Sequence, residues 1–274
     1  MDDREMTLGL AAAAGVTVDA AQIAPLFDLA PELTEWSINP ASDRRGTLRI
    51  STWTRDRAAA SAALDRIAPE LRAVRERLLG DDYEGLGLAL RTEGAPSARW
   101  WALTADGERQ AARVRDAWPV HAAEVDRLLA ATGGPHTCAG AGIEGEQRQT
   151  VYAELRTPEA ALRVLTLAEV RVSRATNLFF KGILGLEPGG RPWPKVWVGR
   201  SLGPGGGWKF YYFARGDELR RTDEVLLDAI SAGPEQLAPW RLLRSVTAGP
   251  WVQLVGLTVP EAGAPSFTAY LART

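Results

Sequence analysis

The sequence contains few of the residues that build covalent cross-links or metal centres. Cysteine occurs once among 274 residues, at Cys138, which excludes a disulfide within the chain. The two histidines, His121 and His136, are isolated, so a zinc site lacks ligands. Cys138 lies in a run of small residues, which favours a packed structural role over a nucleophile, because activation of a thiol requires an adjacent base. We therefore predict no metal site, and a cysteine nucleophile is the less favoured alternative.

The sequence also lacks a surplus of either charge and any long apolar run. Its 32 Lys and Arg residues are matched by 34 Asp and Glu residues, and a net charge of −2 argues against nucleic acid as the main partner. No apolar run is long enough to span a bilayer, and the acidic start at Asp2 and Asp3 is unlike a signal peptide. With 46% apolar and 24% charged residues, the composition is typical of a soluble globular protein, and a single cysteine suits the cytoplasm.

Helical segments and pairs of strands alternate along the chain. The helical segments show apolar residues three and four positions apart, whereas the strand segments alternate and end at Gly, Pro or Asp. Helices are expected over about 7–33, 57–79, 108–131, from Pro158 onward and over 217–245. Strand pairs are expected at 35–39 and 47–53, 85–91 and 99–104, 137–143 and 149–155, 195–201 and 208–214, and 251–259 and 267–272.

These segments form five helix–strand–strand units, which fit an open α+β sheet, two domains or a closed barrel. No segment has the composition of a linker, and ten strands in one open sheet would leave long unpaired edges. We therefore predict one α+β domain over residues 1–274, a ten-stranded antiparallel β-barrel of five αββ units surrounded by helices. Side chains alone fill a barrel of about eight strands, so this wider barrel is expected to contain a substrate lumen.

Glycine recurs at every second position of two predicted strands. Gly85 and Gly87 alternate with leucines, and Gly140 and Gly142 alternate with alanine and isoleucine. Glycine weakens a strand, so its repeated use on one face indicates space for another group, either in a lumen or where a helix packs closely. Both explanations are compatible with the pattern.

The second strand of most units carries a cation, followed at every second position by polar or aromatic side chains. Alternate residues share one face of a strand, so each set points the same way, and the leucine-bearing faces would meet the helices. One such cation is usually a solvated surface residue, but the repetition predicts a cluster of cations inside the barrel. The sets are Arg49, Ser51 and Trp53; Arg99 and Trp101; Arg148, Thr150 and Tyr152; Lys209, Tyr211 and Phe213; and, in the fifth unit, Trp251, Gln253 and Tyr270.

Such a cluster suits a buried diphosphate, whose negative charges require several cations and hydrogen-bond donors. The ten tryptophans add aromatic faces, which stabilise an allylic carbocation and exclude the water that would quench it. Other phosphate motifs fit poorly, because the run from Gly203 to Gly207 lacks a Lys-Ser/Thr pair and lies between strands, as a turn does. Asp81-Asp82 has no second acidic pair to complete a metal motif, so metal-dependent terpene synthase chemistry is unsupported.

The five units with cation–x–aromatic strands resemble the αββα-barrel, or PT-barrel, prenyltransferases over essentially the whole chain. Within that superfamily the sequence is most similar to the cyanobactin-type peptide prenyltransferases. It shares with them a Pro-Leu-Phe stretch that ends a helix and a strand with a Glu-x-Ser core. The matching segments are Pro25-Leu26-Phe27, Glu35-Trp36-Ser37, the strands at 138–143 and 149–155, Pro158-Glu159, Gly256-Leu257-Thr258 and 267–271.

The resemblance implies roles for individual residues. Glu35 would be the base that orients the acceptor and removes its proton. Two features depart from the family pattern: Arg99-x-Trp101 stands where relatives usually have Lys-x-Tyr, and the strand around Trp197 does not align. The residues implied to surround the prenyl diphosphate are Arg49, Arg99, Arg148, Tyr152, Lys209, Tyr211 and Tyr270. The residues expected to line the prenyl and acceptor pocket are Ser37, Trp53, Trp101, Thr150, Phe213, Trp251 and Gln253.

The expected function is transfer of a dimethylallyl or longer isoprenyl group from its diphosphate to a peptide natural product. The acceptor would be an aromatic or other nucleophilic side chain of that peptide, with Trp and Tyr favoured. A small phenol or indole is an alternative acceptor, and a non-catalytic barrel that binds a lipid or aromatic ligand is an alternative from another class. We expect a monomer with no tightly bound cofactor. Relatives differ in whether they need magnesium, so a Mg²⁺ ion that accompanies the diphosphate is left open.

Overall fold

Ten strands form one closed antiparallel barrel in the part of the chain that the structure describes. This computed structural model describes residues 2–13, 15–29, 31–38, 47–78, 83–91, 96–145, 148–169, 195–203, 205–215, 252–261 and 265–273. The strands are β1 (Leu33–Ile38), β2 (Thr47–Thr54), β3 (Tyr83–Arg91), β4 (Ser97–Leu103), β5 (Cys138–Glu144), β6 (Arg148–Leu155), β7 (Val196–Ser201), β8 (Gly207–Arg215), β9 (Val252–Pro260) and β10 (Ser266–Arg273). Each pairs with its neighbours in sequence, and pairing of β1 with β10 closes the ring.

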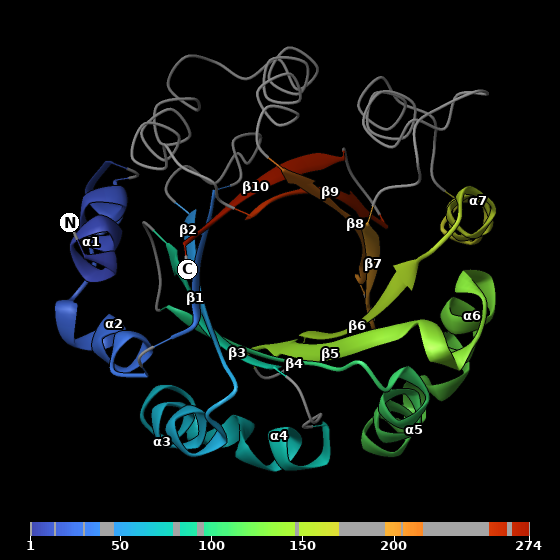
Figure 1. The fold of residues 1–274 in the computed structure, drawn as a ribbon, viewed down its shortest axis with the longest axis horizontal. Coiled ribbons are helices and arrows are strands. Elements are labelled where there is room, and N and C mark those ends of the chain that lie inside the picture. The colour runs from blue at the N-terminus through green and yellow to red at the C-terminus, as the bar shows by residue number, and fades with distance from the viewer. Residues whose placement is uncertain are drawn as a thin grey trace.

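The helices of the described residues lie outside the ring of strands (Figure 1). They are α1 (Asp3–Ala13), α2 (Ala20–Phe27), α3 (Arg57–Ile67), α4 (Arg72–Leu78), α5 (Gly107–Ala117), α6 (Ala122–Thr132) and α7 (Pro158–Leu167). In the view down the barrel they follow one another in chain order around β1 to β7. The predicted α+β class and the antiparallel barrel with helices outside it are confirmed. None of the helices in these ranges is long and apolar enough to cross a membrane.

Three predicted helices are interrupted in the structure. Residues 57–79 form α3 and α4, separated by a 3-10 turn that begins at Pro69, and residues 108–131 form α5 and α6, separated by one that begins at Pro119. Proline cannot donate the backbone hydrogen bond of a helix and clashes with the preceding turn, so each helix ends before it. The single helix predicted at 7–33 is replaced by α1 and α2, because the chain turns near Gly15, whose φ is +69°. The helix predicted at 217–245 lies outside the described residues.

The main hydrophobic core lies between the barrel and its helices. Leu48 and Ile50 of β2 and Trp36 of β1 are fully buried in it. Trp36 also donates a hydrogen bond from Nε1 to the hydroxyl of Thr7 in α1 over 2.8 Å, which ties this helix to the strand. Because successive side chains of a strand point to opposite faces, the remaining half of the strand residues faces the inside of the barrel.

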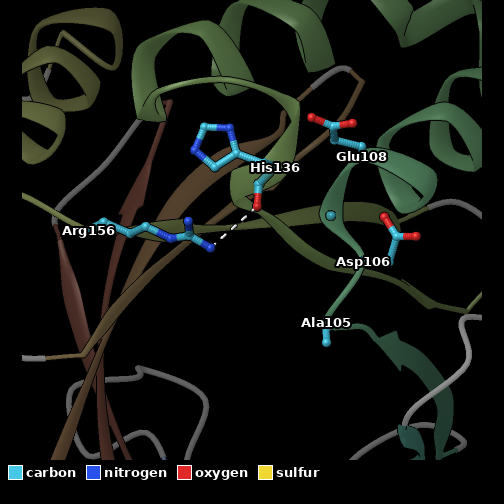
Figure 2. Close-up of a pocket in the computed structure, with 6 residues that line it drawn as sticks. Ala105, Asp106, Glu108, His136 and Arg156 are labelled. Atoms are coloured by element: carbon cyan, nitrogen blue, oxygen red, sulfur yellow. Dashed lines mark hydrogen bonds between the residues drawn. The ribbon is translucent and has the colours of Figure 1, made fainter.

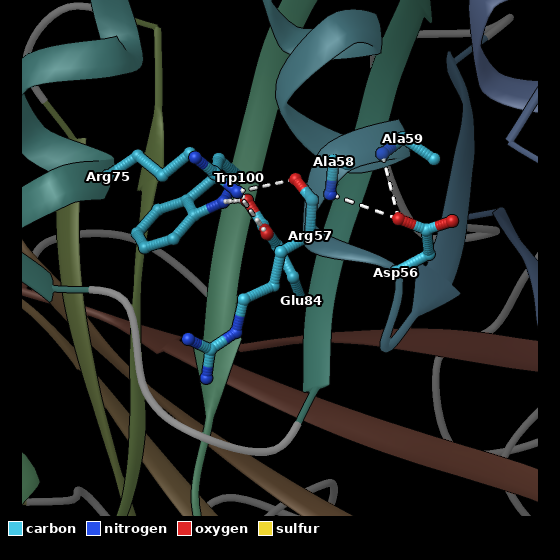
Figure 3. Close-up of polar contacts among 7 residues, drawn as sticks. All are labelled: Asp56, Arg57, Ala58, Ala59, Arg75, Glu84 and Trp100. Carbon is cyan, nitrogen blue, oxygen red and sulfur yellow. Dashed lines mark hydrogen bonds and ion pairs between the residues drawn. The ribbon is translucent and has the colours of Figure 1, made fainter.

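A buried ion pair fastens α4 to the outer face of the barrel (Figure 3). Arg75 of α4 donates two hydrogen bonds to Glu84 of β3, one of them over 2.8 Å, and another of 3.1 Å to the backbone oxygen of Arg57. Trp100 of β4 donates from Nε1 to the same carboxylate over 2.5 Å. Arg75 is 7% exposed and Glu84 is 2% exposed, so each charge depends on the other for compensation.

Glu84→Gln should therefore destabilise the fold. The amide keeps the shape of the side chain but leaves Arg75 buried without a counter-ion, so we expect a loss of roughly 3–5 kcal/mol in the free energy of unfolding. Chemical denaturation followed by circular dichroism measures this loss. As a control, Asp28→Asn breaks an exposed ion pair with Arg66, which has a 2.9 Å contact. That change should cost less than about 1 kcal/mol, and equal losses in the two variants would contradict the importance assigned to the buried pair.

Candidate functional site

The four predicted cations lie within the first three residues of β2, β4, β6 and β8. These strands alternate with antiparallel neighbours, so all of them run in one direction and their first residues lie at the same end of the barrel. The register continues a single inner face around the ring, opposite to the apolar residues that pack under the helices. This cation cluster consists of Arg49 on β2, Arg99 on β4, Arg148 on β6 and Lys209 on β8.

Burial and neighbouring cations lower the pKa of two members of the cation cluster, Lys209 and Arg49. Burial and the charges of the three arginines lower the pKa of Lys209 well below its usual value. Burial and the charge of Arg99 likewise lower the pKa of Arg49. Lys209 donates a hydrogen bond to the hydroxyl of Tyr270 on β10, and its Nζ lies 4.8 Å from the centre of that ring. A concentration of positive charge of this kind attracts an anionic ligand.

A carboxylate that the sequence analysis did not single out lies among these cations. Glu144 ends β5, and the register sets it opposite Arg99 on one side and Arg148 on the other. Its Oε2 lies 3.2 Å from Nε of Arg99. Burial by itself raises the pKa of Glu144, but the surrounding cations, Arg99 above all, lower it to about 2. Glu144 follows Gly142 by two positions, and this alternation was the available signal of its inward direction.

Aromatic side chains form a belt on the same inner face. Trp53 and Trp101 are stacked, with ring centres 5.6 Å apart and planes at 26°. Trp101 donates a hydrogen bond from Nε1 to the hydroxyl of Tyr152 over 3.0 Å. The ring centre of Tyr211 lies 6.0 Å from that of Tyr152 and 6.0 Å from that of Tyr270. This aromatic belt of five side chains thus joins β2, β4, β6, β8 and β10, all at positions that the sequence predicted.

The cation cluster and the aromatic belt touch each other. The guanidinium carbon of Arg99 lies 4.4 Å from the centre of the Trp101 ring, a cation–π contact. Nζ of Lys209 lies 5.3 Å from the centre of the Tyr211 ring. Trp101 therefore contacts both Arg99 and Tyr152.

Trp197 of β7 extends the aromatic surface, although the sequence analysis gave it no role. The register pairs it with Tyr211, and its ring meets that of Phe213 at 71°, with centres 5.0 Å apart. Nζ of Lys195 lies 4.9 Å from the centres of both the Trp197 and the Phe213 rings. The alternation of Trp197 with Gly199 in β7 was the signal that could have assigned it to the inner face.

The alternating glycines make room for two indole rings. A Cβ atom added to Gly85 would lie 2.8 Å from Trp53, and one added to Gly142 would lie 2.3 Å from Trp101. Both distances are shorter than real Cβ contacts, so any larger residue would displace an indole. Of the two explanations for the glycine pattern, a position on the inner face is supported, and aromatic rings occupy the space beside it.

Glu35 lies on β1, where the register pairs it with Ser51 and Ala272 on the inner face. Its side chain is half-buried on this face. Burial raises the pKa of Glu35 to about 7, against the opposing charges of Arg99 and Lys209. At neutral pH both the carboxylate and the carboxylic acid are therefore populated, which suits proton transfer.

Ser37 and Thr150, two further predicted pocket residues, also belong to this face. The register pairs Ser37 with Arg49, and its side chain is buried. Oγ1 of Thr150 lies 3.4 Å from Oγ of Ser201 on the neighbouring strand. These hydroxyls add hydrogen-bonding groups to the face that carries the cation cluster.

The register does not support the predicted inward position of Gln253. β9 pairs Leu254 with Phe213, a residue of the inner face, and pairs Gln253 with Ala214 in the other phase. A shift of one residue reverses the two faces of a strand, so this prediction is out by a single position. Trp251, predicted on the same face, lies outside the described residues.

A surface pocket of about 530 Å³ lies apart from the inner-face residues (Figure 2). Its lining includes Asp106 and Glu108 at the start of α5, with His136 and Arg156 on the other side. Arg156 donates a hydrogen bond over 3.4 Å to the backbone oxygen of His136. No predicted site residue lines this open pocket, so it is not the site that the sequence predicted.

Cys138 is buried at the start of β5. Burial raises the pKa of its thiol to about 12, so the thiol is protonated and a nucleophilic role is not supported. Within the described ranges, no group of three or more His, Cys, Asp or Glu side chains could hold a metal ion.

No protein-family model and no curated protein matches the sequence. Solved structures do match it. The 6-dimethylallyltryptophan synthase from Micromonospora olivasterospora, in complex with DMASPP and Trp, has a TM-score of 0.75 at 17% identity over 98% of this chain and 95% of that chain. The 5-dimethylallyltryptophan synthase from Streptomyces coelicolor has a TM-score of 0.68 at 19% identity over 98% and 96%.

The prenyltransferase PriB, in a ternary complex with L-tryptophan and dimethylallyl thiolodiphosphate, has a TM-score of 0.69 at 16% identity over 98% of this chain and 95% of that chain. Identities at this level show the fold alone. The chain therefore has the fold of the PT-barrel aromatic prenyltransferases.

Glu35→Gln should change how the stability of the fold depends on pH. The pKa of Glu35 is about 7 in the folded protein against 4.5 for the free group, so the folded state binds its proton more tightly. The free energy of unfolding of wild type therefore falls as the pH rises from 4.5 to about 7, by about 3 kcal/mol at most. The variant lacks this loss and should gain stability relative to wild type between about pH 5 and pH 8. Denaturant titrations at both pH values test this, and a constant difference would contradict the raised pKa.

Proposed function

We propose that the protein is a prenyltransferase that transfers a dimethylallyl group from its diphosphate to an aromatic acceptor inside the barrel. The observation that carries the proposal is the contact of the cation cluster with the aromatic belt on one inner face. The chain shares its fold with a structure that holds L-tryptophan and dimethylallyl thiolodiphosphate, which supports the proposal.

The cation cluster would bind the diphosphate of the donor. Three guanidinium groups and one ammonium group offer several charged donors to phosphate oxygens. Burial raises the pKa values of Tyr152, Tyr211 and Tyr270, so their hydroxyls stay protonated and add neutral donors. When the carbon–oxygen bond of the donor breaks, its electron pair moves to the diphosphate, and the fixed positive charges stabilise this leaving group.

The aromatic belt would stabilise the dimethylallyl cation that this cleavage produces. Its ring faces attract the cation, and its apolar surface excludes the water that would convert the cation to an alcohol. The acceptor ring then attacks the cation and forms one carbon–carbon bond. A proton leaves the attacked ring carbon and restores aromaticity. Glu35, whose pKa of about 7 keeps part of it as carboxylate, would orient the acceptor and take this proton.

The acceptor in this proposal is an indole or a phenol. Tryptophan is the acceptor-type ligand named with the similar structures. The sequence resemblance favours a Trp or Tyr side chain within a peptide, and a small indole or phenol is the alternative. Incubation with dimethylallyl diphosphate and either free amino acids or Trp- and Tyr-containing peptides, with and without EDTA, would separate these acceptors and test for a role of magnesium. The cytoplasmic location and the monomeric state stay predictions.

Removal of two members of the cation cluster should abolish donor binding. We expect dimethylallyl thiolodiphosphate to bind wild type with micromolar affinity, and an Arg148→Ala/Lys209→Ala variant to bind at least about 100-fold more weakly, because two charged contacts to the diphosphate are lost. Isothermal titration measures both affinities. The matched control is Arg66→Ala/Arg156→Ala, which removes two exposed, ion-paired arginines and should leave the affinity unchanged. If wild type binds neither this compound nor its geranyl analogue, with or without magnesium, a non-catalytic lipid- or aromatic-binding barrel replaces the proposed function.

Glu35→Gln should abolish turnover without loss of donor binding. The amide cannot accept the ring proton, so kcat should fall by about 10²-fold or more, while the affinity for dimethylallyl thiolodiphosphate should change by less than about threefold. The pH–rate profile of wild type should rise through about pH 7 as Glu35 ionises, with its pKa of about 7. Glu70→Gln, at an exposed position between α3 and α4, is the control. Wild-type turnover in the Glu35 variant would remove this residue from the mechanism.

A further inference from the structure

We infer that Glu144 is an internal counter-ion of the cation cluster, which competes with the diphosphate for the cations and weakens its binding. This inference rests on the proposed function, because it concerns the anion that the same cluster would hold. It assigns to Glu144 a role in releasing diphosphate, the product that remains in the barrel after transfer of the dimethylallyl group.

The geometry places a carboxylate where an anionic ligand would bind. Glu144 ends β5 between two strands that each contribute a cation, with Arg99 opposite it on β4 and Arg148 opposite it on β6. Its Oε2 is 3.2 Å from Nε of Arg99, and its side chain is 15% exposed. Gly145, with φ of +60°, follows directly where the chain turns out of β5, so Glu144 is the last residue of this strand.

The interaction extends beyond the single ion pair. The lowered pKa of Glu144 results from Arg99, Arg49, Arg148 and Lys209 together, against the effect of burial. Conversely, Glu144 opposes the lowering of the pKa of Lys209 by burial and the arginines. The carboxylate therefore favours the charged form of Lys209 when no ligand is bound.

A bound diphosphate changes the sign of this contribution. Its oxygens take the contacts with the cations, and they lie close to a carboxylate of the same charge. The repulsion raises the free energy of the complex, whereas in the free protein the same carboxylate lowers the free energy by balancing the cations. Both effects weaken the binding of any diphosphate, so Glu144 favours release of the product.

The test measures binding of inorganic pyrophosphate and of dimethylallyl thiolodiphosphate to wild type and to Glu144→Gln by isothermal titration. Removal of the charge should tighten both by roughly ten- to hundred-fold, as expected for one charge pair at close range in a partly buried site. In the same variant the midpoint of thermal unfolding without ligand should fall, because Arg99 loses its partner. A residue with a purely structural role would lower both stability and affinity, so the opposite signs separate the two.

Glu154→Gln is the matched control. Glu154 lies on the neighbouring strand β6 and forms an ion pair of 2.9 Å with Arg156. The register places it opposite Trp197 and not opposite a member of the cation cluster. Its removal should leave the pyrophosphate affinity unchanged. If Glu144→Gln does not fold, Glu144→Asp keeps the charge but withdraws it from Arg99, and it should tighten pyrophosphate binding several-fold.

The outcomes distinguish this inference from the proposed function. If pyrophosphate binds wild type and binds the Glu144 variants equally well or more weakly, the counter-ion role is overturned and the proposed function stands. The absence of binding to wild type and to every Glu144 variant would overturn both. Tighter binding in the Glu144 variants, with the Glu154 variant unchanged, is the result that we expect.

Discussion

The interior of the barrel is organised around the repulsion between cations that lie side by side on one inner face, where Arg49, Arg99 and Lys209 are half-buried and Arg148 is exposed. A charge that leaves water for a protein interior is costly, and several like charges side by side add to that cost. The lowered pKa values of Lys209 and Arg49 reflect it directly. Such a cluster exists only if the rest of the fold contributes enough favourable free energy and an anion balances the charge. Glu144 is one such anion, and a bound diphosphate would be another.

The favourable free energy comes from the other face of the same strands. Outward-facing residues such as Ile50 and Trp36 are buried against the helices, and each large apolar side chain of this kind contributes about 1.5–3 kcal/mol when it leaves water. The Arg75–Glu84 pair satisfies its charges internally and fastens a helix to this face. Because the two faces alternate, the apolar core and the charged interior use different positions and do not compete.

Much of the inner face could be predicted from alternation within single strands. The positions of Arg49, Arg99 and Lys209 follow from a period of two and from the repetition of the units. Contacts between strands could not be predicted in this way, because they depend on register. The pairing of Glu144 with Arg99 is one such contact. The phase predicted for β9 was also out by one residue at Gln253, because the sequence of a single strand does not show which of its two faces points inward. The breaks at Pro69 and Pro119 had a local signal, which the apolar periodicity of the long helices obscured.

The two glycines beside the indole rings limit which side chains the inner wall of the barrel can accept. Gly85 and Gly142 have no side chain, and the indole rings of Trp53 and Trp101 occupy the space beside them. A methyl group gained at Gly85 would displace the indole of Trp53, whereas one gained at Gly142 would displace Trp101, the indole that contacts Arg99. A change at Gly142 would therefore alter the aromatic belt and the cation cluster together.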